Sequence, residues 1–152
     1  MTAKAFLLAN EAATARLGAA VAAALRPGEA VCLSGPLGAG KSVLARALVR
    51  ALTRPDEDVP SPTFTLVQFY EGPRLALAHF DLYRLTSADE AFEIGLDEAL
   101  EDGAAVIEWP ERLEGRLPPH RLDIEIAVEG AARRARVSPA GAWEGRELEF
   151  RP

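Results

Sequence analysis

The chain of 152 residues has a single cysteine, Cys32, and so cannot form an internal disulfide. It also has no long apolar run, because the longest, residues 18–25, is well short of the roughly 20 residues that span a bilayer. Residues 1–10 lack the basic segment and long apolar core of a secretion signal. We therefore expect a protein of a reducing compartment, the cytoplasm, with no membrane segment.

The chain also lacks an excess of positive charge. Its 23 acidic and 17 basic side chains give a net charge of −6, opposite to that of a stand-alone nucleic-acid-binding protein. Apolar residues make up 49% and charged residues 26%, proportions usual for a globular chain of this length. We therefore expect one domain over residues 1–152, which would contact a nucleic acid only through a partner.

Helical patterns and apolar strands alternate along the chain. Strands are predicted at residues 6–8, 30–33, 65–70, 75–80, 104–107, 121–128 and 133–137. Helices are predicted at 11–25 after an Asn10 cap, at 41–52, at 87–92 with Ser87 as cap, and at 96–100. This order predicts a three-layer α/β fold like that of phosphate-loop NTPases, with a parallel core and antiparallel additions. After residue 139 the pattern is weak.

One glycine-rich motif has the spacing of a phosphate-binding loop, G-x4-G-K-S, between a predicted buried strand and a predicted helix. Its glycines let backbone amides turn inward as hydrogen-bond donors, and the start of the helix adds positive potential. Lys41 can reach the β- and γ-phosphates, and Ser42 can bind magnesium. The motif predicts nucleotide binding by Gly35, Pro36, Leu37, Gly38, Ala39, Gly40, Lys41 and Ser42.

A magnesium–nucleotide site also needs carboxylates at the ends of neighbouring strands. Two acids fit this description: Asp81 follows the predicted strand 75–80, and Glu108 follows 104–107. We expect at least one of them to serve the metal, and the residues alone do not divide the roles between the two.

Other motifs narrow the class of nucleotide-binding protein. The chain lacks the N-K-x-D and D-x-x-G elements of GTPases and the L-S-G-G-Q signature of transporter ATPases. A small kinase that transfers the γ-phosphate to a metabolite stays open, with Arg112, Arg116 and Arg121 as candidates for its lid. A nucleotide-gated binding module with incidental hydrolysis is a further alternative.

Four motifs in order resemble those of the bacterial TsaE family, the ATPase component of tRNA threonylcarbamoyladenosine biosynthesis. They are G-P-L-G-A-G-K-S at 35–42, S-P-T-F-T-L-V at 61–67, H-F-D-L-Y-R at 79–84 and V-I-E-W-P at 106–110. The chain departs from the family at Pro36, where an acid is common, and at Ser42, where threonine is common. The resemblance implies slow hydrolysis of ATP with Mg²⁺, partners TsaD and TsaB, and contact with tRNA only through those partners.

The resemblance also implies roles for single residues. It makes Ser42 and Glu108 the magnesium ligands, and Asp81 the group that orients the attacking water or holds a metal-bound water. Thr63 would act with Lys41, Asp81 and Glu108 in catalysis, as part of a loop that responds to the γ-phosphate, although a rigid turn is the rival interpretation.

Glu11 and Arg133 match family positions that border the nucleotide, and the family pattern implies a nucleotide-site or interface position for Trp109. His79 lies two residues before Asp81, so the two share a strand face, and we expect it to be a hydrogen-bonded structural residue.

Overall fold

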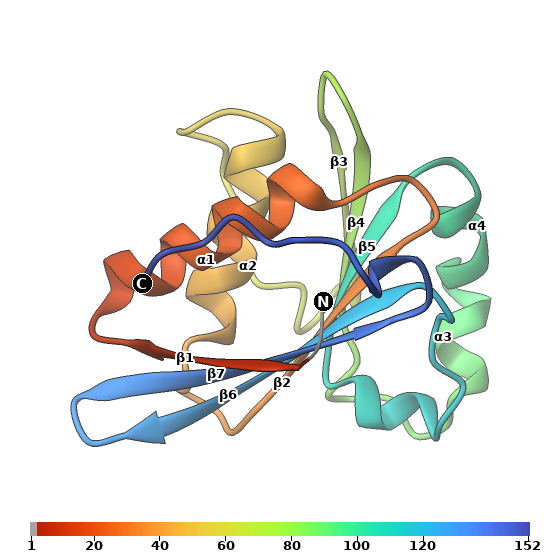
Figure 1. The fold of residues 1–152 in the computed structure, drawn as a ribbon. Coiled ribbons are helices and arrows are strands. Elements are labelled where there is room, and N and C mark those ends of the chain that lie inside the picture. Colours follow the sequence, from red (N-terminus) through yellow and green to blue (C-terminus); the bar gives the residue numbers. More distant parts are fainter. Residues whose placement is uncertain (1–2) are drawn as a thin grey trace.

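The computed structural model describes residues 3–152; Met1 and Thr2, where the stretch tested for a secretion signal begins, lie outside the described residues. Within that range the strands form one sheet of seven, in the order β1-β7-β6-β2-β5-β4-β3 (Figure 1). Their bounds are β1 Lys4–Leu8, β2 Ala30–Ser34, β3 Val67–Glu71, β4 Ala76–Asp81, β5 Ala104–Glu108, β6 Arg121–Glu129 and β7 Ala132–Ala140.

The middle of this sheet is parallel and its margins are antiparallel. Strand β2 pairs in parallel with both β5 and β6, and β5 pairs in parallel with β4. Strand β7 is antiparallel to β6 and to β1, and β3 is antiparallel to β4. The mixed sheet with a parallel core, predicted from the sequence, is thereby confirmed.

Helices cover both faces of the central strands and complete the three layers (Figure 1). On one face lie α1, Glu11–Ala24, and α2, Lys41–Leu52; on the other lie the short α3, Asp89–Glu93, and α4, Leu96–Asp102. Strand β2 is buried on both sides: Val31 and Leu33 join the apolar cluster under α1 and α2, while Ala30 and Cys32 join the opposite cluster. This explains the continuous apolar sequence of β2.

No helix among residues 3–152 has the length and apolar character that a membrane crossing requires.

One local expectation was wrong. Ser87 does not cap a helix: α3 begins at Asp89 after Ala88, and the Glu90 carboxylate instead accepts hydrogen bonds from the backbone amides of Thr86 and Ser87, at 3.0 and 3.2 Å. After residue 139, where the sequence pattern is weak, β7 continues to Ala140 and a 3₁₀ turn, Gly141–Trp143, follows it.

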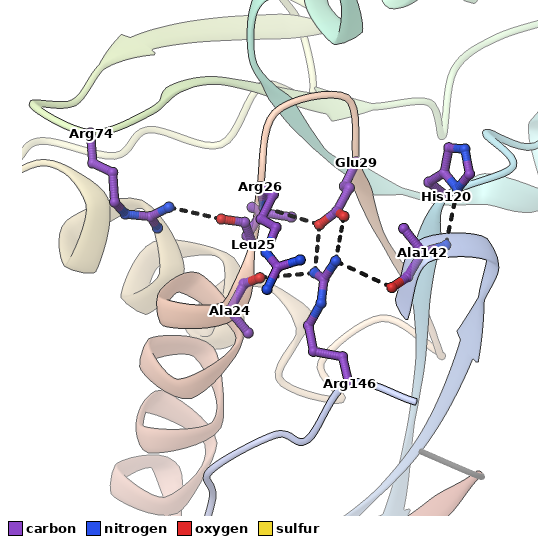
Figure 2. A network of polar contacts seen from close by, with 8 residues as sticks. All are labelled: Ala24, Leu25, Arg26, Glu29, Arg74, His120, Ala142 and Arg146. Atoms are coloured by element: carbon purple, nitrogen blue, oxygen red, sulfur yellow. Dashed lines mark hydrogen bonds and ion pairs between the residues drawn. The ribbon is translucent and has the colours of Figure 1, made fainter. Parts of the chain in front are cut away.

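The segment after β7 is held against the end of α1 by a buried ion pair (Figure 2). Arg146 binds the Glu29 carboxylate with two hydrogen bonds of 2.7 Å, and it also donates to the carbonyl oxygens of Ala24 and Ala142. The Trp143 side chain is fully buried, and the Arg146 guanidinium lies 4.4 Å from the centre of its ring. The segment is therefore anchored to the core by one tryptophan and one arginine, although most of its other residues are exposed.

Candidate functional site

The glycine-rich loop joins β2 to α2 at the carboxyl end of the parallel strands. Gly35, Gly38 and Gly40 have positive φ angles of 139°, 79° and 109°, which residues other than glycine rarely adopt. Gly40 is the N-cap of α2 and offers no capping side chain, so first-turn amides of that helix are available to an anion. A side chain at Gly35 would in addition collide with the Ile126 carbonyl oxygen of β6.

A cavity of about 480 Å³ opens beside this loop. Most of the predicted site residues line it: Glu11, Leu37, Gly38, Gly40, Lys41, Ser42, Thr63, Asp81, Glu108, Trp109 and Arg133. Among the described residues the lining does not include Gly35, Pro36 or Ala39, although Gly35 and Ala39 contact residues that do line it. The structure therefore brings together residues from six separate parts of the chain.

Lys41 is held at the base of the loop by two contacts. Its ammonium donates a 2.6 Å hydrogen bond to the Gly35 carbonyl oxygen, and it lies 3.6 Å from the centre of the Trp109 ring. Burial lowers the pKa of Lys41, and the carboxylates of Glu108, Glu111 and Asp81 oppose that shift by favouring the charged form. The loop thus has one cation beside two carboxylates that line the same cavity.

Asp81 is tied to the loop that precedes β3. Its Oδ2 accepts a 3.0 Å hydrogen bond from the Thr63 hydroxyl, which lies 2.7 Å from the Ser61 hydroxyl. Its Oδ1 accepts a 3.0 Å bond from the Tyr83 backbone amide. Its own amide donates to the carbonyl of Leu66, a residue with a positive φ of 69°. The carboxylate is therefore oriented through both of its oxygens.

Glu108 ends β5 directly beside Asp81, its register partner on β4. Both residues are buried, with Glu108 5% and Asp81 6% exposed, although both line the cavity. The Glu108 Oε2 lies 2.6 Å from the Nε2 of His79, so His79 is hydrogen-bonded as expected. The sequence analysis did not predict that Glu108 is the hydrogen-bond partner of His79. The usable signal was that two predicted strands each end in an acid.

Arg133 reaches the phosphate loop from β7. Its Nε donates to the Ala39 carbonyl oxygen at 3.0 Å, and one terminal nitrogen donates to the Gly38 carbonyl oxygen at 3.3 Å. These bonds tie the phosphate loop to β7 through two of the loop's carbonyl oxygens. Sequence reasoning missed six lining residues: Leu8, Asn10, Thr14, Val43, Ser61 and Ala131. All six lie within three residues of a predicted site residue, so proximity along the chain was the signal.

The three arginines suggested for a kinase lid are engaged outside the cavity. Arg116 binds Asp89 at 2.6 Å, and Arg121 binds Asp123 at 3.1 Å. The guanidinium of Arg112 lies 5.8 Å from the centre of the Tyr83 ring. Within residues 3–152 none of the three lines the cavity, which weakens the kinase alternative.

Comparison with known proteins gives a consistent result. The family model described as "Threonylcarbamoyl adenosine biosynthesis protein TsaE" matches residues 8–136. A "tRNA threonylcarbamoyladenosine biosynthesis protein TsaE" from Treponema pallidum is 42% identical over 116 residues, covering 76% of this chain and 84% of the relative. The protein of the same description from Rickettsia felis is 36% identical over 122 residues, 80% of this chain and 71% of the relative.

A solved structure agrees with these relatives. The crystal structure of YdiB from Bacillus subtilis superposes with a TM-score of 0.76 at 28% sequence identity, and the match covers 92% of this chain and 87% of that one.

Proposed function

This chain belongs to the TsaE family of threonylcarbamoyl adenosine biosynthesis proteins, and from that premise we propose that it serves tRNA modification as an ATPase. The observation that carries the proposal is one cavity that joins a phosphate loop to two strand-end carboxylates. The Lys41 ammonium and the amides of the loop supply positive potential for phosphates, and Asp81 and Glu108 supply oxygen ligands.

The residues present fit magnesium with a nucleoside triphosphate. The Ser42 hydroxyl and the carboxylates of Asp81 and Glu108 are hard oxygen donors of the kind that magnesium prefers. In this proposal Ser42 and Glu108 hold the metal, and Glu11, Trp109 and Arg133 border the nucleotide. Magnesium, when bound, neutralises charge on the phosphate oxygens.

The chain's own residues prepare the hydrolysis. Asp81 orients the attacking water, since the Thr63 hydroxyl and the Tyr83 amide fix its two oxygens. Lys41 holds the terminal phosphates, and Arg133 fixes the loop by binding the carbonyls of Gly38 and Ala39. Hydrolysis by this chain alone is slow in this proposal, because partner contact completes the site.

The proposed partners are TsaD and TsaB, with tRNA held by them and not by this chain. The net charge of −6 supports a component that docks on protein, because a phosphate backbone would repel it. A role in tRNA modification also makes the cytoplasm the proposed place of action.

Hydrolysis of ATP labelled in its γ-phosphate tests the proposal, measured for the purified chain alone and with TsaD and TsaB added. We expect release of free phosphate that rises with the partners. Transfer of the label to a metabolite would favour the kinase, and turnover unchanged by the partners would favour the binding module.

A matched pair of lysine variants tests the site itself. Lys41→Ala should weaken ATP binding about 10- to 100-fold, because a charge-assisted hydrogen bond contributes about 1.5–3 kcal/mol. Lys4→Ala removes the chain's only other lysine, an exposed residue near Glu147, and should leave the affinity unchanged. Equal affinities of the two variants, measured by isothermal titration calorimetry, would contradict a phosphate role for Lys41.

A further inference from the structure

We propose that His79 is a positioning residue for the magnesium site: its imidazole holds one oxygen of the Glu108 carboxylate and leaves the other, Oε1, for the metal. The inference rests on the proposed function, because it takes Glu108 as a magnesium ligand. It assigns a task to a buried side chain that neither contributes to an apolar cluster nor lines the cavity.

The pairing of β4 with β5 brings His79 next to Glu108. His79 pairs in register with Val106 on the parallel strand β5, and Glu108 follows Val106 by two residues on the same face. The side chains are 4% and 7% exposed, and Nε2 lies 2.6 Å from Oε2. A carboxylate can only accept a hydrogen bond, so Nε2 of the ring is the donor. The contact is thus a short, buried, charge-assisted bond between two rigid strands.

The state of the second ring nitrogen, Nδ1, indicates that the bond to Glu108 is the reason for a histidine at position 79. Nδ1 is buried and has no hydrogen-bond partner among residues 3–152, which is destabilising for a polar atom. Two side chains on the same face of the sheet, Leu77 of β4 and the register partner Val106 of β5, are apolar and buried. Packing alone would favour an apolar residue at position 79 as well. The bond to Glu108 is what an apolar residue could not supply.

The same orphan nitrogen distinguishes positioning from proton transfer. A relay through the ring needs a polar partner on each nitrogen, and within the described residues the ring has a partner only at Nε2. His79 therefore acts through Glu108 and not on the reacting atoms. Residues that orient a metal ligand in this way typically contribute 10- to 100-fold to metal affinity.

Two substitutions separate the hydrogen bond from the packing. His79→Leu removes the donor, while His79→Gln can place an amide N–H where Nε2 lies. The probe is Mn²⁺, which replaces magnesium, titrated with a non-hydrolysable ATP analogue and followed by electron paramagnetic resonance. We expect His79→Leu to weaken Mn²⁺ binding about 10- to 100-fold, and His79→Gln to retain most of the affinity. Binding of the metal-free nucleotide should be the same in all three proteins.

The chain's other histidine supplies the matched control. His120 lies just before β6, accepts a hydrogen bond from the Ala142 amide and is not part of the cavity lining among the described residues. His120→Leu should therefore leave Mn²⁺ affinity unchanged. Unchanged affinity in His79→Leu, or equal losses in His79→Leu and His79→Gln, would overturn the positioning role. A wild-type protein that binds no Mn²⁺ with the nucleotide would instead overturn the proposed function.

Nuclear magnetic resonance of the wild-type protein tests the positioning role of His79 if His79→Leu does not fold. With only two histidines, ¹⁵N-labelled rings are assigned by comparing the wild type with His120→Leu. We expect a His79 ring with hydrogen on Nε2 whose signals shift when Mg²⁺ is added with the nucleotide. A hydrogen on Nδ1 alone, or signals that magnesium does not move, would overturn the inference.

Discussion

The ammonium nitrogen of Lys41 lies 3.6 Å from the centre of the indole ring of Trp109, the residue that directly follows β5. Trp109 holds this position in a left-handed backbone conformation, φ 61°, with its amide donating to the Leu33 carbonyl oxygen at 3.3 Å. Its ring also packs edge-on against Tyr83, with centroids 4.8 Å apart. The phosphate loop and the carboxylate strand are thereby joined through one cation–π contact.

This contact predicts a fluorescence signal for nucleotide binding. A cation–π pair contributes about 0.5–2 kcal/mol, less than a charge-assisted bond to phosphate, so bound phosphates should draw Lys41 away from the ring. We expect ATP to change the tryptophan emission of the wild type and of Trp143→Phe, but not of Trp109→Phe. Trp143 is buried outside the cavity lining of the described residues. A change that is lost only in Trp143→Phe would contradict the prediction.

The hydroxyl of Thr63 should matter more for hydrolysis than for binding, because it holds Asp81 at 3.0 Å. Thr63→Val keeps the shape and removes the donor, whereas Thr63→Ser keeps the donor. A hydrogen bond to a charged group contributes about 1.5–3 kcal/mol, so kcat of Thr63→Val should fall about 10- to 100-fold with a smaller change in KM. Thr63→Ser should stay near the wild type in the same steady-state assay. Equal kcat values for the two variants would mean that the loop is only a turn.

Most of the fold was predictable because its signals are local. The apolar run of β2, the glycine loop after it and the amphipathic pattern of α2 each lie within about a dozen residues. The end of the chain was missed for the opposite reason. Arg146 bonds to Ala24 at the end of α1 and to Glu29, more than a hundred residues earlier in the chain, and no local pattern reports that contact. That residues 1–152 form a single domain stays a prediction.

The candidate site likewise has residues that the sequence predicts and contacts that it does not. Lys41, Ser42, Asp81 and Glu108 were predictable because a motif or a strand end marks each of them. The hydrogen bonds that orient the site residues were not predictable, because these bonds depend on the order of strands in the sheet. His79 contacts Glu108 only because β4 and β5 are neighbours, and Arg133 binds Ala39 across 94 residues of chain. The catalytic and metal-binding roles of these residues stay predictions.

Cys32 should be inert in the folded protein. Burial raises the pKa of its thiol to about 12, with a smaller contribution from Asp123. Because the raised pKa favours the neutral thiol, only about one molecule in ten thousand holds a thiolate at pH 8, and the reactive form is the thiolate. We expect iodoacetamide to label the native protein far more slowly than the urea-unfolded protein between pH 7 and 9. Since there is one cysteine, the label reports this position alone; equal rates would contradict the prediction.

The Glu29–Arg146 pair should be important for stability and not for nucleotide binding (Figure 2). Its side chains are 5% and 10% exposed, so removing one partner leaves the other charge buried. Glu29→Gln or Arg146→Met should each lower the free energy of unfolding by about 3–5 kcal/mol, and the double variant should lose less than the sum.

The exposed Arg54–Asp56 pair provides the control, with side chains 65% and 87% exposed. Arg54→Met should cost under about 1 kcal/mol, because solvent screens such a pair. Urea unfolding followed by circular dichroism measures all of these variants, and ATP affinity should be unchanged throughout, since neither pair lines the cavity of residues 3–152. If Arg146→Met unfolds no more readily than Arg54→Met, the buried pair does not anchor the segment after β7.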